Sequence, residues 1–247
     1  MAIHRLLTSG SVAIVHPAEW GALVVAVALA GSPAAAQSLS TNPRELIAMD
    51  PLALSRLLDA SRPVPVPAAV RADALAGLSK QDVVQNLDDG AQRKLAALAP
   101  ILEAAQRASV YSVKVIDVPY AFVGLHARSV VLISEPALRL LTEDELRAVV
   151  AHETGHEYVH AEYQRAIAEG RSGRLQDLEL VCDIIAVMTL RTIGQGAWSL
   201  IAGIERLLRF DRFHFGSDNY ADYPSPLLRR SMMLALEKKI SRVAGRQ

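Results

Sequence analysis

The second half of the chain carries the apolar spacing of helices. Hydrophobic residues recur every three or four positions in four stretches, and the first stretch opens with Thr142 and Glu145, the pair of a capping box. The predicted helices cover residues 143–170, 174–192, 197–210 and 225–243. Similar spacing between residues 79 and 109 predicts two more amphipathic helices, interrupted near Asp88-Asp89-Gly90.

Between these helical regions the pattern changes to the alternation of strands. Residues 110–118 alternate apolar and polar side chains, and residues 121–123 and 129–134 are two further short strand candidates. Gly124 and the polar residues up to Arg128 are expected to form the turn between the last two. We therefore predict an α+β fold that is mostly helical, with a small antiparallel sheet of three strands.

The beginning of the chain has the pattern of an export segment. Residues 20–30 form an uncharged apolar run that small residues follow, and the run is much shorter than the roughly 20 residues of a membrane-spanning helix. We expect residues 1–36 to be a bacterial-type signal peptide, so that the mature protein is periplasmic or secreted. An uncleaved segment would instead anchor the chain in a membrane.

The remaining residues divide into a lead-in and one domain. Residues 37–78 form a proline-rich lead-in, and the alternation of proline at residues 62–67 favours an extended strap. Residues 79–247 contain the predicted helices and strands, with no internal repeat.

Composition narrows the classes of function. The chain is 51% hydrophobic and 21% charged, as expected for a folded domain. It has 26 basic and 26 acidic residues, and this neutrality argues against binding to nucleic acid. The single cysteine, Cys182, excludes a disulfide framework and a multi-cysteine metal site. By helical geometry it points off the face that Glu179 and Asp183 share, so we expect a small core residue rather than a fourth ligand.

One motif predicts metal chemistry. His152-Glu153-Thr154-Gly155-His156 has the form HExxH, and it lies inside the predicted helix at 143–170. Histidines four residues apart project from one face of a helix, where both imidazoles can bind one zinc ion. Glu153, next to the first ligand, can serve as the general base for an attacking water.

A catalytic zinc site needs a third protein ligand. His160 lies about 12 Å from His152 along the helix, too far to share one ion with both histidines. Glu179 on the following helix is the better candidate. Asp183, four residues later on the same face, can accept a hydrogen bond from a ligand imidazole.

These residues resemble metallopeptidase family forty-eight, the HtpX-like and CAAX-prenyl-protease type, over residues 110–230. The resemblance implies a gluzincin-type domain, with the small sheet beside the active-site helix. It also implies that His152, His156 and Glu179 bind Zn²⁺, that Glu153 is the base and that Asp183 supports a ligand. The absence of long apolar spans after residue 30 makes the chain similar to the exported, soluble branch.

Tyr120-Ala121-Phe122 stands in the place of the family's Asn-Ala-Phe-like segment, and the resemblance implies that Ala121 and Phe122 contact substrate by strand addition. Two segments differ from the family pattern. Val123-Gly124-Leu125 lacks the paired glycines that are usual in the lead-in strand of relatives. Tyr223 replaces a histidine that lies near the metal in relatives. Its phenol could donate a hydrogen bond to the tetrahedral oxyanion, or it could occlude the site.

The sequence thus predicts a zinc-dependent metalloendopeptidase that acts on polypeptides, as relatives in envelope protein quality control do. It predicts neither a nucleic-acid partner nor a permanent membrane span if the signal segment is cleaved, and it leaves the oligomeric state open. The alternative is a zinc-bound chaperone or assembly factor with little or no proteolysis. Tyr223 and a proline-rich lead-in lying across the cleft would favour this alternative.

Overall fold

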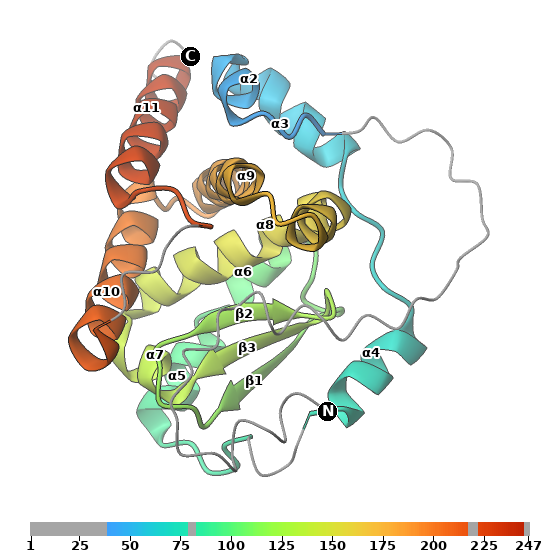
Figure 1. The fold of residues 1–247 in the computed structure, drawn as a ribbon, viewed down its shortest axis with the longest axis vertical. Coiled ribbons are helices and arrows are strands. Elements are labelled where there is room, and N and C mark those ends of the chain that lie inside the picture. The colour runs from blue at the N-terminus through green and yellow to red at the C-terminus, as the bar shows by residue number, and fades with distance from the viewer. Residues whose placement is uncertain (1–38, 79–82, 217–221, 245–247) are drawn as a thin grey trace.

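A computed structural model describes residues 39–78, 83–216 and 222–244 (Figure 1). The predicted signal segment lies outside these residues and stays a prediction. The helices and strands, in chain order, are α2 (Pro43–Ala48), α3 (Pro51–Ala60), α4 (Ala68–Ala76), α5 (Asp89–Ala96), α6 (Ala99–Ala104), β1 (Ser112–Ile116), β2 (Val123–His126), β3 (Val130–Ser134), α7 (Glu135–Leu140), α8 (Glu143–Ala168), α9 (Ser172–Thr192), α10 (Ala197–Phe215) and α11 (Pro226–Ala244).

The long helices confirm the sequence pattern closely. The capping box of α8 is formed as predicted, with the Thr142 hydroxyl accepting from the Glu145 N–H and the Glu145 carboxylate accepting from the Thr142 N–H. α10 continues five residues beyond its predicted end at 210, to Phe215. In the described parts of the chain, no helix combines the length and apolarity that a membrane span requires.

The sheet is mixed, so the prediction of an antiparallel sheet was wrong. Its strand order is β1-β3-β2, with β1 parallel to β3 and β2 antiparallel to β3. After β1, the chain crosses to the other edge of the sheet and forms β2. β3 then pairs with both strands and lies between them. The turn between β2 and β3 is also tighter than predicted, because Gly124 belongs to β2. The two residues of this turn that have positive φ angles are Ala127 and Arg128.

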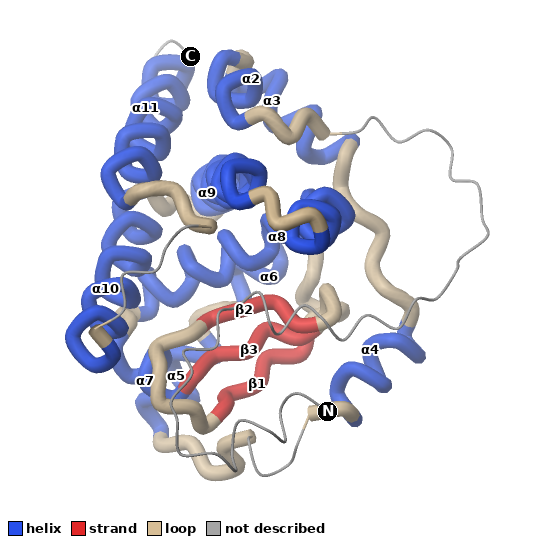
Figure 2. The backbone as a smooth tube through the Cα atoms, viewed as in Figure 1, coloured by secondary structure: helices blue, strands red, loops and turns tan. Residues whose placement is uncertain are grey.

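Helices cover both faces of this sheet, and Figure 2 shows the strands gathered in a single layer among them. α8 lies along one face next to the edge strand β2, and its partner α9 packs against it (Figure 1). On the other face, Ile116, Val130 and Leu132 pack against α4. β3 is buried along its whole length because it lies in the centre of this arrangement.

The segment before α5 contains another correction. Residues 84–88 are not helical, although their apolar spacing predicts a helix there; residues 79–82 of that predicted helix lie outside the described residues. Val83 instead forms an isolated bridge with Ile116, and the Val84 N–H donates to the Val115 carbonyl. Pairing with the free edge of β1 satisfies backbone groups here, and helix α5 begins only after its cap, Asp88.

The proline-rich lead-in contains helices that the sequence pattern did not predict. Pro43 and Pro51 occupy the first turns of α2 and α3, positions that tolerate proline, and Asn42 and Asp50 cap these helices. Residues 62–67 are free of helix, as the prediction of an extended strap requires. The lead-in also contributes to the core through three buried leucines, Leu46, Leu54 and Leu58.

Candidate metal centre

The site is built on the close packing of α8 against α9. A Cβ atom added to Gly155 would lie only 3.0 Å from the Cα atom of Cys182, so the glycine of the HExxH motif lets the two helices approach. Cys182 is fully buried, as predicted for a small core residue. This contact brings the carboxylates of α9 next to the histidines of α8.

The three predicted ligands come together. One donor atom each from His152, His156 and Glu179 lies within 4.8 Å of the other two. The His152 Nε2 to Glu179 Oε2 distance is 3.2 Å, and the His156 Nε2 to Glu179 Oε1 distance is 3.7 Å. Ligands of a tetrahedral zinc ion lie about 3.3 Å apart. Two nitrogens and one oxygen that lie within 4.8 Å of one another could therefore converge on one zinc ion, and three protein ligands would leave a fourth position for water or substrate.

Asp183 lies beside this cluster and contacts His152. Its Oδ1 atom lies 2.9 Å from His152 Nδ1, which leaves Nε2 of that ring facing Glu179. Arg229, at the start of α11, donates from Nε to Asp183 Oδ2 and from Nη2 to Asp183 Oδ1, at 2.8 and 2.6 Å. All three side chains are buried, so the arginine compensates a carboxylate that water cannot reach.

The charges of the cluster are set by burial and by these contacts. Burial raises the pKa of Glu179, but His156 and His152 lower it to about 2, so the carboxylate is ionised. Burial lowers the pKa of His152, whereas its hydrogen bonds to Asp183 and Glu179 raise it to about 10. Burial lowers the pKa of His156 to about 4 against the opposing attraction of Glu179.

Glu153 lies between this cluster and the edge strand. Its carboxylate accepts a backbone hydrogen bond from Leu125 of β2 and interacts with His152 and Glu179. Burial, with Glu179 as a further contribution, raises the pKa of Glu153 to about 7. The residue predicted to be the general base therefore stands beside the ligands.

Tyr223 reaches the same site from the loop before α11. Burial raises its pKa, and the neighbouring carboxylates of Glu179 and Glu153 raise it further, so the phenol keeps its proton. The sequence prediction that this residue stands near the metal ligands is consistent with these interactions. Its chemical role stays a prediction.

Ala121 and Phe122 lie just before β2, and their backbone N–H groups are already engaged. The Ala121 N–H donates to Asp211 of α10 at 3.2 Å, and the Phe122 N–H donates to the Ser134 hydroxyl at 2.8 Å. A substrate strand would have to add further along β2. Their predicted role in substrate binding stays a prediction.

His160 is not one of the residues with ligand spacing, in agreement with the sequence argument. It is half-buried on α8, and burial together with Arg128 lowers its pKa.

Two residues of the site were given no role from the sequence. Arg229 is one of them, and its partner Asp183 lies 46 residues earlier in the chain. Tyr163 donates its hydroxyl to Glu179 Oε1 at 2.9 Å. Because it follows His156 by seven residues, two helical turns, the spacing could have placed it on the ligand face.

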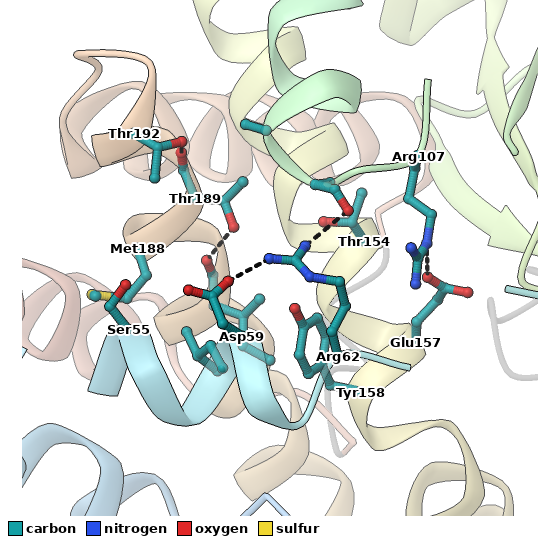
Figure 3. Close-up of a pocket in the computed structure, with 14 residues that line it drawn as sticks. Ser55, Asp59, Arg62, Arg107, Thr154, Glu157, Tyr158, Met188, Thr189 and Thr192 are labelled. Atoms are coloured by element: carbon teal, nitrogen blue, oxygen red, sulfur yellow. Dashed lines mark hydrogen bonds and ion pairs between the residues drawn. The ribbon is translucent and has the colours of Figure 1, made fainter. Parts of the chain in front are cut away.

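A separate cavity of about 60 Å³ lies on the faces of α8 and α9 that point away from the ligands (Figure 3). α3 of the lead-in covers it, and Arg62 spans it by donating to Asp59 and to the Ala105 carbonyl. Thr154 and Glu157 of α8 line its wall. The lead-in therefore packs behind the motif helix.

Comparison with known families agrees with this site. Residues 87–200 match the model described as peptidase family M48, and no curated protein matches the chain. The matched segment contains the three candidate ligands together with Glu153 and Asp183, whereas Tyr223 and Arg229 follow it. Over this segment, the chain is similar to peptidase family M48, a family of metallopeptidases.

Proposed function

We propose that the protein is a zinc-dependent metalloendopeptidase that hydrolyses peptide bonds in polypeptide substrates. The observation that carries the proposal is the cluster of His152, His156 and Glu179, with Glu153 beside it, inside the segment that matches peptidase family M48. The donor atoms have the chemistry and spacing of a catalytic zinc site.

In this proposal each side chain has a defined task. His152, His156 and Glu179 would hold the metal, and Asp183 fixes the tautomer of His152 through Nδ1. When bound, zinc supplies Lewis acidity, which polarises a scissile carbonyl and makes water a better nucleophile near neutral pH. Glu153 accepts the proton of the attacking water and donates it to the leaving amine.

Tyr223 is the proposed donor to the oxygen that becomes negatively charged. Its interactions with Glu179 and Glu153 support a position beside the reacting group, and its raised pKa keeps a proton available for donation. Tyr223→Phe is expected to lower kcat while KM changes little. A fall in KM with unchanged kcat would instead indicate that the phenol occludes the site.

The alternative, a zinc-bound chaperone or assembly factor, is less well supported. This alternative is favoured if the strap at residues 62–67 lies across the cleft. Among the described contacts, Pro63 and Val64 accept hydrogen bonds from Arg107 and Arg128, and neither arginine belongs to the metal cluster. Both arginines pair with Glu157, so these contacts hold the strap beside a residue that is not a ligand.

We further propose that the protein works in the periplasm or outside the cell, on unfolded polypeptides of the envelope. The support is the apolar run at residues 20–30 of the sequence. Cell fractionation with N-terminal sequencing should find an exported chain that begins at Gln37. A full-length chain in the cytoplasm would contradict this part of the proposal.

The peptidase proposal is tested by Glu153→Gln, which keeps the size of the side chain and removes its basicity. Casein hydrolysis by the zinc-loaded wild-type protein is expected, together with a loss of at least about 100-fold in the variant. Both proteins should bind one zinc ion, since Glu153 is not a ligand. Zinc binding without any Glu153-dependent cleavage would support the chaperone alternative.

A further inference from the structure

Tyr163 contacts two of the candidate ligands at once. Its hydroxyl donates to Glu179 Oε1 at 2.9 Å. The edge of one ring meets the face of the other between Tyr163 and His156, with ring centroids 5.0 Å apart and an interplanar angle of 89°. The tyrosine therefore constrains both the second and the third ligand from the C-terminal half of α8.

The two carboxylate oxygens of Glu179 have different surroundings. Oε2 lies 3.2 Å from His152 Nε2, while Oε1 accepts from Tyr163 and lies 3.7 Å from His156 Nε2. A hydrogen bond to Oε1 lowers the ability of that oxygen to donate electrons to a metal. It also restrains rotation of the carboxylate about its last bond, which burial alone does not fix.

We infer that Tyr163 is a positioning residue that makes Glu179 bind the metal through Oε2 alone. This inference rests on the proposed zinc site and specifies how its carboxylate is used. Asp183 contacts Nδ1 of His152 and leaves Nε2 of that ring free for the metal. In the same way, Tyr163 holds Oε1 of Glu179 and leaves Oε2 free. Binding through one oxygen preserves the open fourth position that hydrolysis requires.

The direct test is Tyr163→Phe, which removes the hydroxyl and keeps the ring against His156. Zinc affinity is measured by competition with a chromophoric chelator. Loss of the partner of a ligand typically weakens metal binding by about 10- to 100-fold, and we expect a loss in this range. Thermal melting of the metal-free variant confirms that it is folded.

Tyr158→Phe is the matched control. Tyr158 is half-buried on the same helix but lines the cavity behind α8, away from the ligands (Figure 3). Removing its hydroxyl should leave zinc affinity within about twofold of the wild-type value.

Cobalt substitution provides a second readout that a purely structural role would not alter. In Tyr163→Phe the freed Oε1 can join Oε2 on the ion, so the visible absorption should weaken and shift, as expected when coordination number rises. Wild-type zinc affinity and an unchanged cobalt spectrum in this variant would overturn the inference alone. Failure of the wild-type protein to bind zinc would overturn the proposed function as well.

Discussion

At the scale of single residues, Arg229 illustrates how the fold stabilises the site. It donates two hydrogen bonds to the buried carboxylate of Asp183, which in turn holds His152. Removing one partner of a buried ion pair costs about 3–5 kcal/mol because the remaining charge is uncompensated. Arg229→Gln should therefore lower the free energy of unfolding by about this amount in urea denaturation, and it should weaken zinc binding.

The neighbouring Arg230 provides a control for this prediction. Its side chain is 44% exposed and pairs with Glu205, whose side chain is 37% exposed. An exposed pair contributes about 0–1 kcal/mol. Arg230→Gln should thus be nearly neutral. Equal losses of stability in the two variants would contradict the role given to Arg229.

Gly155 carries a second residue-scale prediction. A Cβ atom at this position would lie 3.0 Å from Cys182 Cα and 3.2 Å from Cys182 Cβ, so Gly155→Ala should force α8 away from α9. Overpacking of this kind costs about 1–3 kcal/mol. Both the melting temperature and the zinc content of the variant should fall, because Glu179 moves relative to the histidines.

Gly173 is the comparison for this substitution. It lies in the first turn of α9, and an added Cβ atom would meet nothing within 4 Å. Gly173→Ala should leave the melting temperature unchanged or raise it, since alanine favours helix. A Gly155→Ala protein that melts and binds zinc like Gly173→Ala would refute the close-packing argument.

At the scale of elements, the lead-in behaves as part of the domain core. Leu54 of α3 is fully buried, whereas Leu52 on the same helix is 53% exposed. Leu54→Ala should cost about 2–5 kcal/mol of unfolding free energy, because it removes buried methyl groups and leaves a cavity. Leu52→Ala should cost far less. Similar small effects at both positions would mean that α3 is loosely attached.

The helices and strands also show which features of the fold could be predicted from local sequence and which could not. The ends of α8 could be predicted because capping groups and apolar spacing are local signals. The partner of β1 could not, since alternation of side chains leaves the choice of neighbouring strand open. Val83 was assigned to a helix because its spacing is helical, yet in the structure it bridges to Ile116.

The same distinction applies to the candidate site. His152 and His156 were predictable because a separation of four residues fixes a shared helix face. Glu179 followed from its place on the next helix with Asp183. Arg229 could not be assigned a role, since its partner Asp183 lies on a different helix and 46 residues earlier in the chain.

At the scale of the whole molecule, the site and the lead-in share the same helices. α11 supplies Arg229 to the ligand cluster and Lys239 to the end of α2, where the lysine donates to the carbonyls of Ile47 and Ala48. Arg174 of α9 donates to the Thr41 carbonyl in the same way. The lead-in is thus attached to α9 and α11, the two helices that carry Glu179 and Arg229.

The central claim is that peptide hydrolysis depends on one zinc ion bound by His152, His156 and Glu179. The most direct measurement is hydrolysis of a peptide by metal-free protein titrated with zinc. We predict no cleavage without metal, a rise that reaches its maximum at about one zinc per chain, and no recovery in Glu179→Ala. Full activity without zinc, or none at any zinc concentration, would contradict the claim.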